Sequence, residues 1–429
     1  MRYLCGVVIQ VTLIAFARGQ NSITLEECLR LASENSPQIR IADNAHRAAE
    51  LSLSELKTTG LPQVKGIISA SYIPIPPTFG YDPAISNGGQ VGGQVVLQQS
   101  LFDAGIRSLK TDQLESDMGR FQMERRLAQQ DLILAIRQSF VEGLRAQEET
   151  ALQRQSVRQL DGYLDLVQRL NKGGGASYTD LLKTQMQAFS AQLALEKAVE
   201  STVTAKLALA ELVGVPLDTS VHLEGSLSQL SGQAADTLVA GREADIATTL
   251  DMSIASLSVQ RSLLDHDIAS HERLPEISIF ADAGYLTSGE NLRLPAVERV
   301  NAFGYSVGIG VEVPLLNWGA TTMRIQQREL ATEDLRQKME ILRRSLLTDA
   351  SRSRLQLARA RDRLTALRVN VAKAEENFLL TKAKYAAGGT LALEVLTAQQ
   401  LLTEFRLSEL HTLAEIQSLV ARLQRLHVH

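Results

Sequence analysis

The sequence of 429 residues lacks several features that define common protein classes. It contains only 2 cysteines, too few for a disulfide framework. Its formal net charge of −4 gives no general attraction to nucleic acid or to anionic lipid. Beyond the N-terminal segment no run of about 18 apolar residues occurs, so no membrane-spanning helix is expected. Because 45% of the residues are hydrophobic and 21% are charged, the chain is not disordered. Composition alone indicates a soluble helical protein.

The N-terminal segment instead indicates export. Arg2 is followed by an apolar stretch that ends at Ala17, where small residues at alternate positions form a cleavage site. This pattern is typical of a secretory signal peptide, which we assign to residues 1–19. A buried N-terminal helix is the alternative. Removal of the peptide leaves Cys28 as the single thiol, and in an amphipathic helix we expect it to be a small buried apolar residue.

Proline and glycine are missing from long stretches. Neither occurs from Ala320 to Ala387, a segment rich in strong helix formers. Its roughly 68 positions would form a helix about 100 Å long. A similar stretch with isolated glycines follows Asp103. Helices of this length do not fit inside an ordinary globular domain, and their charges exclude a membrane span.

Small and apolar residues in the second long stretch follow a heptad spacing. They step alternately by three and four from Ala350 to Phe378, which predicts a coiled-coil seam. Alanine and serine in that seam suit helices that pack side by side into a sheet or a tube. Shorter helices are expected at 177–213 and 391–427, each joined to its long partner by a glycine turn. The sequence therefore predicts two αα-hairpins.

Four shorter segments alternate with a period of two, which is typical of strands. The cleanest has an apolar face made by Phe303, Tyr305, Val307, Ile309 and Val311. The residues between them are small or polar. Apolar residues on one face and polar residues on the other are typical of a membrane β-barrel strand, with the apolar face toward lipid. A soluble sheet with one wet face is the alternative.

The chain is an internal duplication, because residues 101–105 (LFDAG) align with 315–319 (LLNWG) at a constant offset. We therefore divide it into two repeats and a connector at 214–245. The first repeat, 20–213, comprises a helix, a β-hairpin at 63–101, a long helix at 103–171 and a helix at 177–213. The second, 246–429, comprises a helix, a β-hairpin at 276–314, a long helix at 318–387 and a helix at 391–427.

Four strands cannot close a membrane barrel, since the smallest barrels need 8. Open edges would leave backbone groups without hydrogen bonds in lipid. The economical solution is a homotrimer with a 12-stranded barrel, in which the long helices continue from the strands as a helical tube. The expected fold is mainly α with a β-barrel part: a long α-helical coiled-coil tunnel and four membrane strands per chain.

The order of these elements, with Leu-Phe-Asp-Ala-Gly after the second strand and Pro-Leu-Leu-Asn-Trp-Gly after the fourth, resembles the outer membrane efflux protein (TolC) family. The resemblance covers essentially all of the mature chain. It implies a trimeric channel in the cell outer membrane that extends into the periplasm. Such channels are exit ducts for efflux pumps and type I secretion systems. The implied partners are outer membrane lipid, a periplasmic adaptor (membrane fusion) protein and an inner membrane transporter, with no nucleic acid.

The resemblance also implies a gate at the periplasmic end of the tunnel. Tyr385 matches the gate tyrosine of the family, Asp180 its acidic partner, and Glu394 the first of two acidic ring positions. Thr390 stands where well-known members have an arginine, and Thr397 where they have the second acid. We therefore expect fewer charge-assisted links in the closed state. Glu394 has two interpretations: a three-fold ring that attracts cations, or a solvated carboxylate at a helix start.

The glycine turns, which comprise Gly173, Gly174, Gly175, Gly388 and Gly389, are expected to supply positive φ and to form the tip surface that adaptor hairpins meet. No metalloprotease, paired CxxC or phosphate-loop motif occurs, so we expect no enzyme, metal site or cofactor. Two functions from different classes remain: a trimeric outer membrane exit duct, or a soluble periplasmic coiled-coil scaffold or adaptor. The duplication and the strand alternation favour the duct.

Overall fold

The computed structural model describes residues 22–73, 88–215, 218, 220–230, 246–288 and 301–427. The expected signal peptide lies outside the described residues, as do most of both hairpin loops and the second half of the connector. The chain divides into two compact units. Unit 1 takes the described residues of 1–39, 128–246 and 346–429, and unit 2 those of 40–127 and 247–345.

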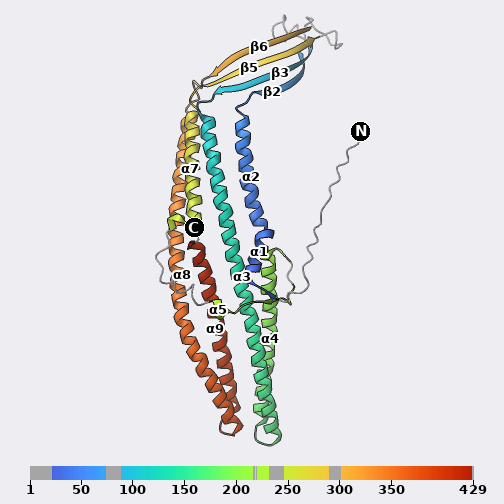
Figure 1. The fold of residues 1–429 in the computed structure, drawn as a ribbon, viewed down its shortest axis with the longest axis vertical. Coiled ribbons are helices and arrows are strands. Elements are labelled where there is room, and N and C mark those ends of the chain that lie inside the picture. The colour runs from blue at the N-terminus through green and yellow to red at the C-terminus, as the bar shows by residue number, and fades with distance from the viewer. Residues whose placement is uncertain are drawn as a thin grey trace, which may run out of the picture. The chain divides into compact units, whose positions relative to one another are not determined.

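Unit 2 contains a four-stranded antiparallel sheet, drawn as one curved layer in Figure 1. Its strands are β2 (Gln63–Ile73), β3 (Gly88–Phe102), β5 (Glu276–Ser288) and β6 (Asn301–Glu312), in the order β2-β3-β5-β6. One row across the sheet consists of Val64, Leu97, Ala281 and Val307. Because paired residues share a face, the four expected apolar stripes combine into a single surface.

The strand-to-helix junctions of the two repeats have the same backbone conformation. Positive φ occurs at Ala104 and Gly105 (56° and 80°) and again at Trp318 and Gly319 (54° and 84°). The Asp103 carboxylate accepts a hydrogen bond from the backbone N–H of Gly105 at 3.2 Å, which stabilises the first of these turns. The long helices therefore begin later than the expected residues 103 and 318. They are α3 (Ile106–Lys172) and α8 (Ala320–Ala386), and each runs through both units.

The helices of unit 2 meet through small and polar side chains. Besides parts of α3 and α8, they are α2 (Pro37–Thr58), which begins just before the unit boundary, and α7 (Leu250–His271), preceded by the short turn η1 (Ile246–Thr248). The buried hydroxyls of Ser262 and Thr332 lie 2.8 Å apart and join α7 to α8. Small side chains let helix backbones approach closely, and the hydrogen bond offsets the cost of burying the hydroxyls.

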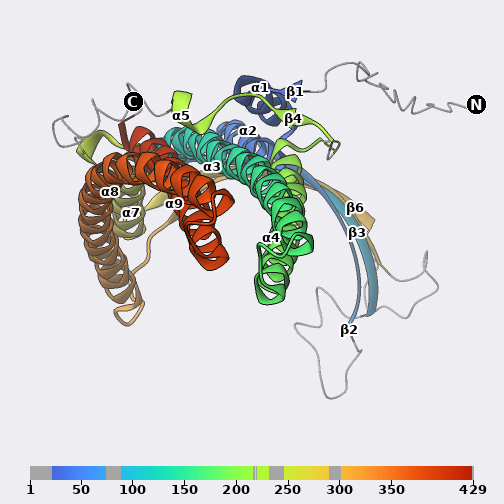
Figure 2. The same cartoon turned by 90° about the horizontal axis from the view of Figure 1, so that it is seen from below.

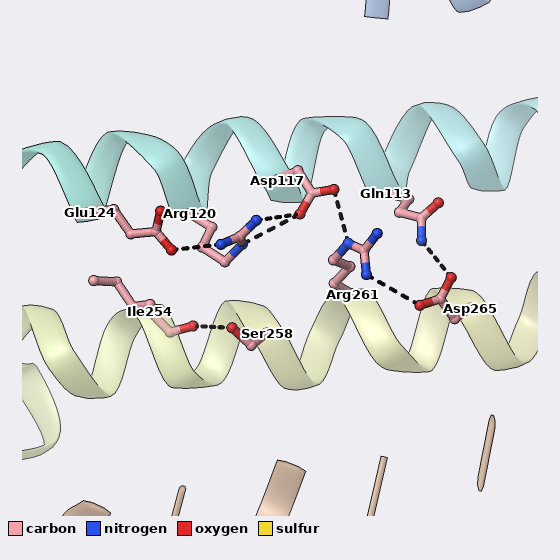
Figure 3. A network of polar contacts seen from close by, with 8 residues as sticks. All are labelled: Gln113, Asp117, Arg120, Glu124, Ile254, Ser258, Arg261 and Asp265. Carbon is pink, nitrogen blue, oxygen red and sulfur yellow. Dashed lines mark hydrogen bonds and ion pairs between the residues drawn. The ribbon is translucent and has the colours of Figure 1, made fainter. Parts of the chain in front are cut away.

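A charged network joins α3 to α7 (Figure 3). The Asp117 carboxylate accepts hydrogen bonds from Nε of Arg261 at 2.9 Å and from the Arg120 guanidinium at 3.3 Å. Arg120 also pairs with Glu124 at 2.6 Å. Because Asp117 is buried and contacts two guanidinium groups, its charge is compensated at the position where the two helices meet.

Unit 1 consists of two helical hairpins and the segments packed on them. The first hairpin is the lower part of α3 with α4 (Tyr178–Val213), and the second is the lower part of α8 with α9 (Ala392–His427). Figures 1 and 2 show that both turns lie at the same end of this unit. Every residue of the expected seam from Ala350 to Phe378 is buried or half-buried, so the heptad prediction is confirmed.

The helix expected at the start of the first repeat is two helices. The first is α1 (Leu25–Asn35), and α2 begins at Pro37. Ser36 between them is extended, with φ −62° and ψ 121°. This correction has a local cause, since proline disfavours helical geometry in the preceding residue and is itself favoured at the first helical position.

The connector contributes regular structure that the sequence did not indicate. Its β4 (His222–Leu223) pairs in parallel with β1 (Ser22–Ile23), and α5 (Leu227–Leu230) follows. The Gln147 side chain of α3 bonds to both the N–H and the C=O of Leu223, at 3.1 and 3.2 Å. The Leu223 side chain lies over Gly143, where a Cβ would stand 2.5 Å from Cδ1 of the leucine. The connector is thus fixed to the middle of the first hairpin.

Candidate functional site

The expected gate tyrosine is buried in a hydrophobic cluster at the hairpin tips. Tyr385, in the last turn of α8, packs with residues of α3, α4 and α9. Burial raises the pKa of Tyr385, and the nearby Asp180 carboxylate raises it further. The structure therefore brings Tyr385 and Asp180 close together from different hairpins. Asp180 is placed by the first turn of α4, where its N–H donates to the N-cap Ser177 hydroxyl at 3.0 Å.

The other two expected gate residues contact each other instead. Glu394 lies in the first turn of α9, and its exposed carboxylate accepts a hydrogen bond from the Thr390 hydroxyl. No hydrogen bond or ion pair links this pair to Tyr385 or Asp180 within the described residues. A carboxylate in the first turn of a helix is favourable in itself. Both interpretations of Glu394 therefore stay open.

The two glycine turns share one hydrogen-bond pattern. The N–H of Gly175 donates to the carbonyl of Leu170 at 2.7 Å, and that of Gly389 to the carbonyl of Lys384 at 2.9 Å. Positive φ occurs only at Gly174 (77°) and Gly388 (75°), so the expectation that all five glycines supply it is wrong. The pattern is that of a Schellman motif, in which one left-handed residue suffices. All five glycines are exposed.

A residue that the sequence did not single out lies at the centre of this cluster. Tyr163 of α3 is 1% exposed, and its ring meets that of Tyr385 edge-on, with centroids 5.3 Å apart and planes at 62°. Its hydroxyl donates a long hydrogen bond of 3.4 Å to the carbonyl of Ala392 at the start of α9. The 3-4 spacing of Leu160, Tyr163 and Val167 above the glycine turn was the available signal.

The sheet of unit 2 exposes a large apolar face. Phe303 is 68% and Tyr305 79% exposed, and Val307, Ile309 and Val311 on the same face are also exposed. Alternate residues of β2 from Val64, of β3 from Val91 and of β5 from Ile277 lie on the same face and extend this surface across all four strands. A continuous apolar patch of this extent marks a surface that contacts lipid or another protein.

The opposite face of the sheet is mostly small and polar, and its larger apolar side chains are Ile67, Ile73, Val96, Phe280 and Leu286. The Ser306 hydroxyl donates to the Asp282 carboxylate, which stands opposite it in the register. Phe280 lies over Gly308, where a Cβ would be 2.5 Å from its Cζ atom. Glycine is therefore required there, and the phenylalanine covers the backbone that glycine leaves bare.

Two features of other protein classes are absent from the described ranges. In those ranges no helix carries an apolar stretch long enough to cross a membrane. Over the same ranges no three histidine, cysteine, aspartate or glutamate residues are grouped so that they could hold a metal ion.

Comparison with known proteins agrees with this geometry. A sequence profile of outer membrane efflux proteins matches residues 28–215 and 245–427, which is most of the chain and both repeats. The chain belongs to the outer membrane efflux protein family. Its helical tunnel segments and membrane strands are the elements of that family's fold.

Individual members of the family are similar along nearly the whole chain. The alkaline protease secretion protein AprF of Pseudomonas aeruginosa is 26% identical, over 90% of this chain and 80% of AprF. The outer membrane protein TolC of Vibrio cholerae is 24% identical, over 93% and 89%. The crystal structure of VceC from Vibrio cholerae has the same fold, with a TM-score of 0.77 and 16% identity over 94% and 96% of the two chains.

Membership of the efflux family decides between the two functions considered above. The protein is an outer membrane exit duct for efflux or type I secretion, and it is located in the outer membrane and extends into the periplasm. The soluble scaffold is set aside. The family is one of channels and transport proteins.

Proposed function

We propose that three copies of this chain form the duct, with a 12-stranded barrel in the outer membrane and a helical tunnel in the periplasm. The observation that carries the proposal is the four-stranded sheet with an apolar outer face and unpaired edges at β2 and β6. An unpaired edge in lipid costs several kcal/mol per backbone group. Pairing β6 of one copy with β2 of the next removes every edge when the ring closes.

Exposed apolar residues on the helices support assembly as well. Tyr178, Met186 and Phe189 of α4 are among the most exposed large side chains of unit 1. They recur at spacings close to one or two helical turns, which places them in one stripe. A neighbouring copy would cover this stripe, because exposed apolar stripes are uncommon on monomers.

We further propose that the hairpin tips form the periplasmic gate and the docking surface. Tyr385, Asp180, Glu394 and Thr390 would control opening, while the exposed glycine turns would meet a periplasmic adaptor. The adaptor and an inner membrane transporter would supply the energy, and the duct itself would catalyse no reaction and need no cofactor. AprF, by its name, serves protease secretion, and this supports a type I secretion role as one use of the duct.

Native mass spectrometry of the detergent-solubilised full-length protein tests the assembly. We expect a mass of three chains and, in planar lipid bilayers, discrete conductance steps that appear only with the three-chain species. A predominant one-chain or two-chain species with equal channel activity would overturn the trimer. As a control, Phe303→Asp on the apolar face should prevent membrane insertion, whereas Gly304→Asp on the opposite face should not, since nothing lies within 4 Å of a Cβ at Gly304.

A further inference from the structure

Charged side chains link the two helices of the second hairpin of unit 1, but near the tips, within the described residues, they do not link that hairpin to the first. Within the second hairpin, ion pairs join α8 to α9 between Glu375 and Arg406 at 3.0 Å and between Arg368 and Glu409 at 3.4 Å. Between the two hairpins, the described residues from the glycine turns up to Ser156 and Gln399 include no ion pair. The second hairpin is thus held together by charges of its own, whereas the ion pair of the described residues that joins it to the first, between Arg425 of α9 and Asp131 of α3 at 2.6 Å, lies far from the tips.

Tyr163 makes the polar contact that crosses between the hairpins in this region. Its hydroxyl bonds to the carbonyl of Ala392, the first residue of α9, while its ring packs against Tyr385 at the end of α8. One side chain of α3 therefore touches both helices of the second hairpin beside their turn. The Tyr385 hydroxyl is buried and has no partner with good hydrogen-bond geometry in the described residues, although the Tyr163 hydroxyl lies near enough to affect its pKa, so ring packing is the well-formed contact of Tyr385.

The next polar contact toward the middle of the hairpins is a single hydrogen bond. There Nε2 of Gln399, a residue 2% exposed, donates to the Ser156 hydroxyl at 3.0 Å, and Oε1 of Gln399 has no partner among the described residues. Beside this bond, a groove of about 520 Å³ separates α9 from α3 and α4. Ala191, Ala398 and Leu402 at this level belong to the same buried cluster as Tyr163 and Tyr385, and the ring pair is the aromatic contact of that cluster beside the turn.

We propose that Tyr163 is a positioning residue of the gate, and that its edge-on contact with Tyr385 holds the second hairpin in the closed position. This rests on the proposed function of the tips as a gate. The aromatic contact takes the place of the charge-assisted links that Thr390 and Thr397 cannot make. The ring is the essential part, because a hydrogen bond of 3.4 Å between oxygens is long and weak.

The test compares single-channel conductance of the full-length protein in planar lipid bilayers. Tyr163→Leu keeps an apolar side chain but removes the ring, and we expect the resting conductance to rise at least threefold. Tyr163→Phe keeps the ring and should stay within 1.5-fold of the parent protein. Phe140→Leu is the matched control, since Phe140 is on the same helix and equally buried, at 1% exposed, in the other cluster. It should lower the melting temperature without changing the conductance.

A double variant separates direct contact from two independent effects. Tyr385→Leu should also raise the conductance, and Tyr163→Leu with Tyr385→Leu should be no leakier than the leakier single variant. If the conductance increases of the two single variants multiply in the double variant, the two residues act independently and the proposed ring contact is refuted. If Tyr163→Leu leaves the conductance unchanged while Tyr385→Leu raises it, the role of Tyr163 is refuted, but the tip gate is not. Unchanged conductance in both would overturn the tip gate itself. If Tyr163→Leu fails to assemble, a Tyr163→Phe conductance above threefold that of the parent overturns the role of the ring.

Discussion

The orientation of the sheet can be tested with two adjacent residues of β6. Val307 belongs to the exposed apolar face, near the middle of the strand, and Ser306 lies on the polar face bonded to Asp282. We therefore compare Val307→Arg with Ser306→Arg. The two substitutions add the same charge and differ in position by one residue, so backbone effects are nearly matched.

The expected magnitude follows from the depth of Val307 in the membrane. An arginine on the lipid face near the midplane of a barrel costs about 2–4 kcal/mol. At about 1.4 kcal/mol per factor of ten, this lowers the folding equilibrium by about 30-fold to 700-fold for each chain. In Ser306→Arg the guanidinium faces the Asp282 carboxylate across the strand pair, where opposite charges are favourable. We expect that variant to stay within about 1 kcal/mol of the parent protein.

The assay is urea-dependent folding into phospholipid vesicles, followed by protease resistance of the embedded strands. Val307→Arg should shift the folding midpoint to lower urea, while Ser306→Arg should not. Outer membrane fractions from a sucrose gradient provide the cellular counterpart. Equal losses in both variants, or a greater loss in Ser306→Arg, would refute the assignment of the apolar face to lipid.

Three further perturbations address other parts of the molecule. Gly143→Ala would push a methyl group onto Leu223; overpacking costs about 1–3 kcal/mol, so amides of residues 220–230 should exchange about 5-fold to 150-fold faster. Glu394→Gln should weaken block of the channel by multivalent cations, because it removes a carboxylate from the tip. Burial raises the pKa of Tyr163 and Tyr385 above the ordinary value of about 10. Their contribution to stability is therefore complete below about pH 10 and is lost as the pH rises above it, which tyrosinate absorbance during alkaline unfolding will follow.

Each of these has a matched control. Gly162→Ala is in the same helix with nothing within 4 Å of the new Cβ, so residues 220–230 should exchange as in the parent protein. Glu376→Gln alters an exposed carboxylate of α8 and should leave cation block unchanged; equal effects would remove Glu394 from the gate. Tyr163→Phe should not alter the titration of the folded protein near pH 10. If Tyr163→Phe removes a group that titrates near pH 10 in the folded protein, Tyr163 is accessible to solvent and the expected rise in its pKa is wrong.

Composition was misleading about the membrane for a physical reason. The charged helices dominate the average composition of the chain, and in strands such as β6 only alternate residues are apolar. A strand needs no continuous apolar run to cross a membrane, because its backbone groups bond to the neighbouring strands. The alternation from Phe303 to Val311 and the signal-peptide pattern carried the information that the totals concealed.

The sequence by itself determined those features that depend on residues near one another in the chain. The period-two stripe of β6, the heptad seam of α8 and the strand-to-helix turns at Gly105 and Gly319 are of this kind, because strand, helix and turn geometry set the spacing. The break at Pro37 was also readable locally. The internal duplication could also be recognised from the sequence, because this requires only an alignment of the chain with itself.

Only the tertiary structure decided which distant segments meet. Tyr163 and Tyr385 are far apart in the sequence, and nothing near either residue specifies the other. The same holds for the docking of Leu223 on Gly143 and for the pairing of β3 with β5. Such contacts form when many weak apolar and polar interactions are satisfied together, and a local pattern contains no record of its partner. The residues of the expected gate could therefore be named from the sequence, whereas Tyr163, which we propose holds them, emerged from the packing of α3 against α8 and α9.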